Sequence, residues 1–267
     1  MITIGSLFSG IGGIDLGLER AGMECAWQVE IDDYATKVLE KHWPNVRRWK
    51  DVSTFPPRPI QKWKCDLIAG GFPCQDISYA GKGAGLDGER SGLWWEFARI
   101  IRTLEPRYVL VENVGALLTR GIDAVLGTLA SIGYDAEWHC IPAAAVGAPH
   151  IRDRVFIIAY TKYDGCSRQS QFSQSESNSE QHRLTGTCQI ESDAQQLPVY
   201  SQMVRCFRFG NRHSSENWWA IEPDMGRVAH GVPSRVDRLR CLGNAVVPQV
   251  AEVVGRRLME LAVWEGA

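Results

Sequence analysis

The sequence predicts an α/β protein built on a mainly parallel sheet, and three observations support this fold class. Over the first 160 residues, short apolar runs alternate with amphipathic segments, as in repeated strand and helix units. Several apolar runs end in glycine-rich or polar turns, which are typical of the carboxyl ends of parallel strands. The chain has 267 residues, enough for one large domain of this kind and a small appended region.

Five strands and five helices are expected in order along the chain. The strands cover residues 2–8, 25–30, 66–69, 108–111 and 155–160, and a poorly marked element precedes Asp51. The first helix lies between Gly13 and Gly22, and the second begins at Asp33 and ends before Pro44. The apolar faces of the second to fifth helices are Tyr34, Val38 and His42; Leu93, Phe97, Ile100, Ile101 and Leu104; Val125, Leu129 and Ile132; and Val250, Val254, Leu258 and Leu261.

The composition changes at about residue 161 and divides the chain into three parts. Residues 1–160 carry the expected sheet, and residues 226–267 return to helical periodicity. Between them, residues 161–225 begin with a stretch rich in Ser, Gln and Asn. Within it, residues 167–196 fit a surface loop as well as a small folded module. We therefore expect a main domain, a short inserted region and a C-terminal return to the main domain.

Charge, hydropathy and cysteine usage limit the class of protein. The net charge is −2 and the isoelectric point about 6.3, so a nucleic-acid partner would need local basic clusters. No apolar run reaches the roughly 18 residues that span a bilayer, and the start of the chain lacks a secretory signal. We expect a cytoplasmic protein that binds no membrane. The eight cysteines form no Cys-x-x-Cys pair, so no metal site is expected, and four are interpreted as small buried apolar residues: Cys25, Cys65, Cys140 and Cys241.

A glycine turn and an acidic residue indicate a nucleoside site. Phe8-Ser9-Gly10-Ile11-Gly12 joins the first strand to its helix, and Glu30 ends the next strand 20 residues after Gly10. That spacing suits a carboxylate that accepts hydrogen bonds from ribose hydroxyls, although Glu30 alone would pass for a solvated strand end. Because the turn lacks the Gly-x-Gly-x-x-Gly cradle for a pyrophosphate, a nucleoside such as S-adenosylmethionine is favoured over NAD. Asp51 is a candidate partner for the adenine amino group.

Reactive side chains are expected at the same edge of the sheet. Cys74 follows the third strand in a turn of glycines and a proline, Glu112 follows the fourth strand, and Arg152 and Arg154 precede the fifth. A thiol, a carboxyl group and two guanidinium groups suit attack on an electron-poor ring such as cytosine, whose C6 is electrophilic once N3 is protonated. Attack at C6 lets C5 take a methyl group from a sulfonium. In isolation, Glu112 would be a helix-capping residue and the arginines a surface pair.

These motifs resemble, in order, those of the cytosine-C5 DNA methyltransferase family of bacteria and phages. The matching stretches are residues 7–13 (Leu-Phe-Ser-Gly-Ile-Gly-Gly), 71–75 (Gly-Phe-Pro-Cys-Gln), 112–114 (Glu-Asn-Val), 152–154 (Arg-Asp-Arg) and 243–248 (Gly-Asn-Ala-Val-Val-Pro). The second stretch, with the cysteine, is the most specific. Two positions depart from the family's pattern: Ser6 stands where an acidic residue is common, and His150 stands where glutamine is usual.

The resemblance implies a fold, a cofactor and a set of site residues. The fold would be the S-adenosylmethionine-dependent methyltransferase fold, a mainly parallel seven-stranded sheet with helices on both faces, and a small target-recognition region. Cys74 would attack a cytosine flipped out of double-stranded DNA, with Glu112, Arg152 and Arg154 as the other catalytic residues. Gln75, Ser78 and Lys82 would lie on a loop that closes on DNA. S-Adenosylmethionine would contact Phe8, Ser9, Gly10, Ile11, Gly12, Gly13, Glu30, Ile31, Asp51, Val52 and Asn244.

Residues 161–225 stand where the family reads the DNA sequence. Arg205, Arg208 and Arg212 alternate with aromatic residues there, a pattern that suits phosphate contacts and base readout. A small apolar core with solvated arginines would give the same pattern. A second basic group follows, formed by Arg227, Arg235, Arg238 and Arg240.

Other functions compete with DNA methylation. One is a relative that methylates tRNA, and another is a non-catalytic DNA-binding protein that keeps the fold. The four intact residues Cys74, Glu112, Arg152 and Arg154 argue against the second. A nicotinamide-dependent oxidoreductase is disfavoured by the glycine spacing and by the Pro73-Cys74 turn. The expected partner is double-stranded DNA; a cognate restriction endonuclease is a further candidate partner, and a monomer is expected.

Overall fold

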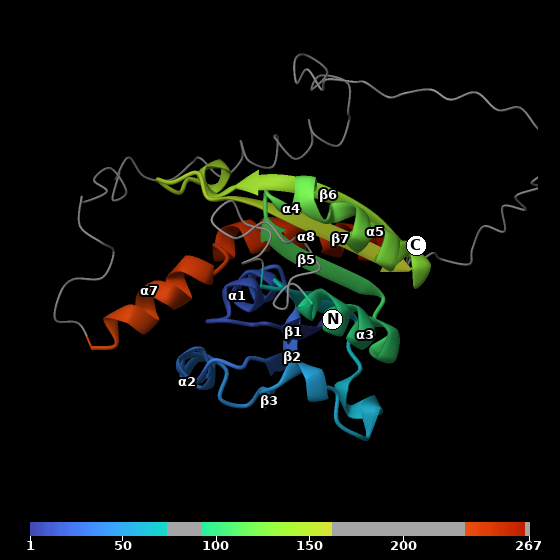
Figure 1. Ribbon diagram of the computed structural model, residues 1–267, viewed down its shortest axis with the longest axis horizontal. Coiled ribbons are helices and arrows are strands. Elements are labelled where there is room, and N and C mark those ends of the chain that lie inside the picture. The colour runs from blue at the N-terminus through green and yellow to red at the C-terminus, as the bar shows by residue number, and fades with distance from the viewer. Residues whose placement is uncertain (74–91, 162–232, 265–267) are drawn as a thin grey trace, which may run out of the picture. The chain divides into compact units, whose positions relative to one another are not determined.

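The computed structural model describes residues 1–73, 92–161 and 233–264 (Figure 1). The chain divides into two units, Met1–Lys162 with Trp218–Ala267 and Tyr163–Asn217, and every described residue belongs to the first. The predicted domain boundaries therefore stay predictions. The predicted site residues that lie outside the described residues are Cys74, Gln75, Ser78, Lys82, Arg205, Arg208 and Arg212.

Seven strands form one sheet in the order β3-β2-β1-β4-β5-β7-β6. Neighbouring strands from β3 to β5 pair in parallel, whereas β7 runs antiparallel between β5 and β6. The predicted fold class, a mainly parallel seven-stranded sheet, is confirmed. The strands are β1 (Thr3–Leu7), β2 (Glu24–Val29), β3 (Arg47–Trp49), β4 (Leu67–Gly70), β5 (Tyr108–Val114), β6 (Tyr134–Pro142) and β7 (Asp153–Thr161).

Helices cover both faces of this sheet (Figure 1). On one face α1 (Gly13–Arg20) packs against α8 (Pro248–Trp264), and on the other α3 (Leu93–Leu104) packs against α5 (Ile122–Ser131). The remaining helices are α2 (Asp33–His42), α4 (Leu117–Arg120) and α7 (Arg235–Asn244), and short 3-10 turns lie at η1 (Val52–Thr54), η2 (Ile60–Trp63) and η4 (Ala143–Val146). No helix among the described residues is both long and apolar enough to cross a bilayer.

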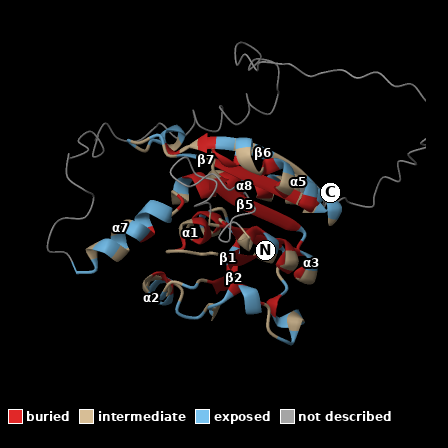
Figure 2. Ribbon diagram, in the orientation of Figure 1, coloured by how far each residue is buried: buried red, intermediate tan, exposed pale blue. Residues whose placement is uncertain are grey.

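The core is densest between the sheet and α3. As predicted, α3 buries one apolar face, with Phe97, Ile100 and Ile101 fully inaccessible to solvent. Burying a side chain of this size stabilises the fold by roughly 1.5–3 kcal/mol. Figure 2 shows that the buried residues concentrate on the central strands, whereas α7 is largely exposed. The rigid centre of the sheet therefore supports the loops at its edge.

The strand β6 was not predicted. Its pattern of burial places a buried residue near each end, Tyr134 and Ile141, and exposed or half-buried residues between them. An edge strand needs no continuous apolar run, because only part of it faces the core. For the same reason Cys140 is exposed, which makes its predicted burial wrong; Cys25 and Cys241 are buried as predicted, and Cys65 is half-buried.

Two helices differ from the sequence prediction. The buried residues of α2 are Ala35 and Leu39, one position beyond the predicted Tyr34 and Val38, and the predicted His42 is exposed. The helix α7 was not predicted, because only Cys241 within it is buried. Polar contacts, described below, hold α7 against the main sheet.

Candidate active site

A cavity of about 410 Å³ opens where the parallel strands end. The loops after β1, β2, β3 and β4 line it, together with the end of β5 and the start of β7. The segment from Arg240 to Val246 closes it from the C-terminal part of the chain. Ligands of open α/β sheets bind at this edge. Most of the predicted cofactor and catalytic residues that the structure describes line this cavity, whereas Ile11, Gly12 and Arg152 line a second one.

Glu30 forms one end of this cavity. Its Oε2 accepts a hydrogen bond from the Gly10 N–H at 2.7 Å, and its Oε1 accepts one from the Asp32 N–H at 2.8 Å. Burial raises the pKa of Glu30, and these two N–H groups oppose that effect. The left-handed backbone of Gly10, at φ 55°, allows its N–H to turn toward the carboxylate. Both oxygens are therefore held in place before any ligand arrives.

Three further predicted cofactor residues lie beside Glu30. Ile31 lines the cavity although 67% of it is exposed, so it presents an uncovered apolar surface. Val52 is buried behind it. Asp51 caps η1 through Oδ1, which accepts hydrogen bonds from the Ser53 N–H and Oγ–H, and these bonds lower its pKa. Phe8, Ser9 and Gly13 also line the cavity, as does Asn244.

The structure does not bring Ile11 and Gly12 into this cavity. They line a second cavity of about 490 Å³, and Gly13 borders both. A Cβ on Gly12, whose φ is 81°, would lie 2.4 Å from the Trp43 ring, and one on Gly13 would lie 2.3 Å from the Val246 carbonyl oxygen. A side chain at either position would collide with its neighbours, so both glycines serve the close packing of the turn.

Glu112 lines the part of the cavity formed by β5 and β7. It is 8% exposed, and its Oε1 lies 3.1 Å from the Arg154 Nε. The β5–β7 register places Arg154 opposite Val114, two positions from Glu112 along the same face. Burial raises the pKa of Glu112 to about 7 although Arg154 and Arg152 both lower it. Gly71 makes room for this carboxyl group, since a Cβ there would lie 2.5 Å from Oε2.

Asn113 holds the turn that leads to the predicted nucleophile. It is buried, and its Nδ2 donates a hydrogen bond to the Phe72 carbonyl oxygen at 3.2 Å. The Phe72 ring packs on Trp94 with centroids 5.5 Å apart. Pro73 lines the cavity, and Cys74 is the next residue in the chain. The turn before Cys74 is thus fixed by β5 on one side and by α3 on the other.

Arg152 and Arg154 have different surroundings. The Arg152 guanidinium donates hydrogen bonds to the carbonyl oxygens of Gly243, at 2.7 Å, and Ala245, at 2.5 Å. Arg152 therefore holds the two residues on either side of Asn244, whereas Arg154 contacts the carboxyl group of Glu112. These contacts give Arg152 a positioning role toward the C-terminal motif, and its predicted catalytic role stays a prediction.

Comparison with known proteins decides the family. The family model of the C-5 cytosine-specific DNA methylases matches residues 2–211. This chain belongs to that family. The resemblance inferred from the ordered motifs is confirmed.

Several methylases are similar over part of their length. The chain is 38% identical over 162 residues to the type II methyltransferase M2.BsuMI of Bacillus subtilis (strain 168), which covers 58% of this chain and 41% of that protein. It is 36% identical over 157 residues to the type II methyltransferase M.NgoFVII of Neisseria gonorrhoeae, and the match covers 57% of this chain and 42% of that protein. A solved structure described as a DNA modification methyltransferase encoded within an E. coli prophage shares 30% identity at a TM-score of 0.52, covering 60% and 47%. The chain spans about two fifths of the length of these curated relatives.

The departure at Ser6 from this methylase pattern has a structural answer. The Ser6 Oγ–H donates a hydrogen bond to Asp15 Oδ2 at 3.0 Å, and Gln28 Nε2 donates one to Oδ1 at 3.0 Å. All three residues are buried, and burial raises the pKa of Asp15. A buried carboxyl group is therefore present beside Ser6, but it comes from Asp15 of α1.

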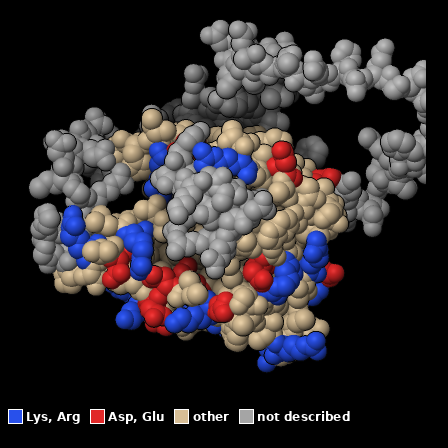
Figure 3. All heavy atoms as spheres, viewed as in Figure 1, with Lys and Arg blue, Asp and Glu red and all other residues tan. Residues whose placement is uncertain are grey.

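Sequence reasoning missed Asn113 and Gly71 as site residues, although both stand in the methylase motifs. It also treated Arg240 as part of a basic group, whereas Arg240 is paired with Asp32 and Asp237. Acidic and basic side chains are interspersed on the face drawn in Figure 3. An aspartate before an amphipathic helix signals a helix cap, and this signal would have found Asp32.

Proposed function

We propose that this chain transfers a methyl group from S-adenosylmethionine to C5 of cytosine in double-stranded DNA. Glu112 carries the proposal: a buried carboxyl group with a pKa of about 7 lies beside Arg154, in the same cavity as the Glu30 and Gly10 pair. A carboxyl group that keeps its proton near neutral pH can donate it to a base. The cavity thus joins a nucleoside-binding end to a proton-donating end.

S-Adenosylmethionine fits the end formed by the loops after β1, β2 and β3. The fixed carboxylate of Glu30 offers acceptors for the two ribose hydroxyls, and the exposed Ile31 offers an apolar surface to adenine. A volume of about 410 Å³ lies within the range of small-molecule sites, roughly 300–1,000 Å³. When bound, S-adenosylmethionine supplies an electrophilic methyl group on its sulfonium sulfur. Phe8, Ser9, Gly10, Gly13, Asp51, Val52 and Asn244 complete the proposed site.

The chain's own side chains then divide the chemistry. The Cys74 thiolate adds to C6 of the target cytosine, and N3 takes a proton from Glu112 as the ring electrons shift toward C5. Arg154 holds the Glu112 carboxyl group and binds the cytosine O2 oxygen. After C5 has taken the methyl group, the C5 proton is lost to solvent, the C5–C6 double bond re-forms and the C6–S bond breaks to release the Cys74 thiolate. N3 returns its proton to Glu112, which restores the ring. Arg152 keeps the C-terminal motif at the cavity.

The DNA contacts remain predictions from the sequence. Cytosine must leave the base stack for its C6 to be attacked, so we propose base flipping with Gln75, Ser78 and Lys82 on a closing loop. Residues 161–225 are proposed to set sequence specificity, with Arg205, Arg208 and Arg212 as contacts. A restriction endonuclease partner and a monomeric state also stay predictions.

A trapping experiment tests the activity and the nucleophile together. Purified protein is incubated with S-adenosylmethionine and duplex DNA that carries 5-fluorocytosine, which blocks loss of the group at C5 and so retains the adduct. We expect a covalent complex with the unsubstituted protein and none with Cys74→Ala, which should still bind the cofactor. Bisulfite sequencing of DNA from a host that expresses the chain identifies the methylated sites. Methyl transfer to tRNA with none to duplex DNA would overturn the proposed substrate.

A further inference from the structure

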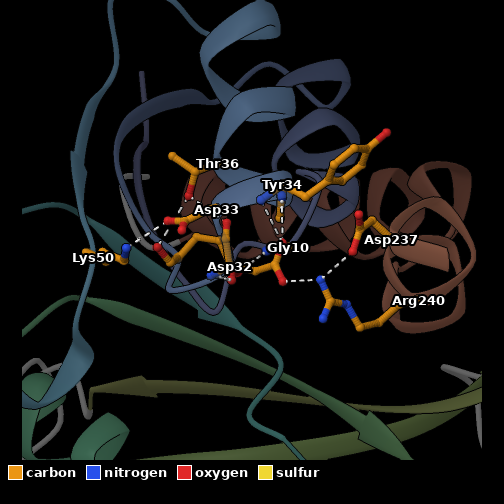
Figure 4. A network of polar contacts seen from close by, with 10 residues as sticks. Gly10, Asp32, Asp33, Tyr34, Thr36, Lys50, Asp237 and Arg240 are labelled. Atoms are coloured by element: carbon orange, nitrogen blue, oxygen red, sulfur yellow. Dashed lines mark hydrogen bonds and ion pairs between the residues drawn. The ribbon is translucent and has the colours of Figure 1, made fainter. Parts of the chain in front are cut away.

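An arginine of α7 reaches across to the loop that carries Glu30 (Figure 4). The Arg240 guanidinium pairs with Asp32 Oδ2 at 2.5 Å and with Asp237 Oδ1 at 3.2 Å. Arg240 and Asp32 are 208 positions apart in the chain, and both line the cavity. The ion pair therefore joins the C-terminal helix to the proposed cofactor site.

Asp32 connects this ion pair to Glu30. Its N–H donates the hydrogen bond to Glu30 Oε1, so its backbone fixes one carboxylate oxygen. Its Oδ1 accepts hydrogen bonds at 2.9 Å from the Tyr34 and Ala35 N–H groups and caps α2. The other oxygen, Oδ2, contacts Arg240. One side chain thus links the start of α2, the helix α7 and the position of Glu30.

The charges around the cavity make Arg240 the cation that matters for Asp32. The charged and titratable side chains that line the cavity with Glu30 are Asp32, Lys50, Asp51, Glu112, Arg154, Arg240 and Cys241. Among the cations of this set, Lys50 pairs with Asp33 at 2.7 Å and Arg154 pairs with Glu112. Arg240 is left to offset the negative charge of Asp32, which itself disfavours a second negative charge on Glu30.

We propose that Arg240 is a positioning residue for cofactor binding, acting through Asp32 to keep Glu30 charged and aligned for the ribose. The inference rests on the proposed function, because it takes S-adenosylmethionine as the ligand of this cavity. Loss of the guanidinium leaves the Asp32 carboxylate uncompensated next to Glu30. That carboxylate then raises the pKa of Glu30. As the pH falls, Glu30 therefore takes up a proton, and loses its charge toward the ribose, at a higher pH than in the unsubstituted protein.

The test compares cofactor affinity across pH in a set of variants and a matched control. S-Adenosylmethionine and S-adenosylhomocysteine are titrated by calorimetry between about pH 5 and 8 into the unsubstituted chain, Arg240→Gln, Asp32→Asn and the double variant. Asparagine keeps the helix cap of α2 while it removes the charge. Arg256→Gln is the matched control, because Arg256 forms a surface ion pair with Glu252 on α8. Thermal unfolding of each protein shows that it is folded.

The charge argument gives a distinct result for the Arg240 variants and for the double variant. Arg240→Gln should weaken affinity about fivefold at neutral pH, the upper range for a half-exposed ion pair, and more as the pH falls. Its loss of affinity on acidification should begin at a higher pH. The double variant should regain the original pH profile, because no uncompensated carboxylate remains, and Arg240→Lys should regain part of the affinity.

Two outcomes would overturn the inference, and one would overturn the proposed function. If Arg240→Gln weakens cofactor binding by the same factor at every pH and the double variant regains no affinity, Arg240 only stabilises the local structure. If Arg240→Gln binds the cofactor as tightly as Arg256→Gln does, Arg240 has no role in the site. If the unsubstituted protein binds neither ligand at any pH, the proposed cofactor itself is wrong.

Discussion

Glu112 illustrates how burial and charge compete at a single residue. Arg154 contacts its carboxyl group and Arg152 lies close enough to act on it, and both favour the charged form. Burial of nearly the whole side chain outweighs them and raises its pKa to about 7. A carboxyl group in contact with a guanidinium is normally a permanent anion. Here, burial outweighs the guanidinium, so the carboxyl group keeps its proton up to a pH near 7.

The role of Glu112 leads to a prediction about pH and substitution. Glu112→Gln keeps the shape but has no proton to give, so methyl transfer should fall by about 100-fold or more. Because the protonated form donates, the rate of the unsubstituted enzyme should fall as the pH rises above about 7, through the pKa of Glu112. Initial rates of tritiated methyl transfer to duplex DNA, measured against pH at saturating cofactor, check both statements. Calorimetry should show nearly unchanged S-adenosylhomocysteine binding, and a variant with full activity would exclude Glu112 as the donor.

The C-terminal elements of the chain are held by contacts at several points. Arg152 bonds the Gly243 and Ala245 carbonyl oxygens, and Arg240 pairs with Asp32. Further along, Gly17 of α1 lies so close to α8 that a Cβ there would be 2.4 Å from the Pro248 carbonyl oxygen. These contacts place Asn244 at the cavity, although α7 buries almost no apolar surface.

The second prediction separates the role of Arg152 from that of a catalytic residue. Arg152→Gln loses the charge-assisted hydrogen bonds to two carbonyl groups, which are worth about 1.5–3 kcal/mol each when the donor is charged. We expect KM for S-adenosylmethionine to rise about tenfold or more, with a much smaller change in kcat. Steady-state kinetics with Arg257→Gln as a control on α8 provides the measurement. A large loss of kcat at unchanged KM would return Arg152 to the catalytic set.

The sequence predicted those elements whose own residues pack into the core. The central strands β1, β4 and β5 are buried along almost their whole length and consist mainly of apolar residues. The helix α3 repeats its apolar residues at helical spacing, so each of these elements carries its own signal. Among the described residues, the strand β6 pairs with β7 alone and buries only Tyr134 and Ile141. The helix α7 is fixed by polar contacts with distant residues. The buried face of α2 was misplaced by one position because Tyr34 and Val38 fit helical spacing as well as Ala35 and Leu39 do.

Site residues could be predicted where motif and strand end coincide. Glu30 directly follows β2 and Glu112 lies near the carboxyl end of the parallel strand β5, so topology alone brings them to one edge. The partners of Asn113 and Arg152 could not be predicted in this way. Asn113 bonds a residue 41 positions away and Arg152 bonds residues 91 and 93 positions away. No local spacing encodes such contacts.

At the scale of the whole molecule, the cavity is shared by both ends of the described chain. Its lining runs from Phe8 after β1 to Val246 before α8, and it includes the loops after four parallel strands. A ligand that fills it therefore contacts elements that must all be folded and docked together. Binding of such a ligand to the folded state alone stabilises the whole domain by mass action.

The third prediction follows from this coupling. S-Adenosylhomocysteine at about 100 times its dissociation constant should stabilise the fold by about 2.7 kcal/mol, which for a domain of this size raises Tm by roughly 5–10 °C. Differential scanning fluorimetry of the full chain, with and without the ligand, measures the shift.

NAD at the same concentration should leave Tm unchanged, because the glycine turn offers no pyrophosphate cradle. Because Arg152 fastens the C-terminal segment to the cavity, Arg152→Gln should show a smaller shift at the same ligand concentration. An equal shift with NAD would reopen the oxidoreductase alternative, and the absence of a shift with both ligands would contradict a cofactor site shared by the two ends of the chain.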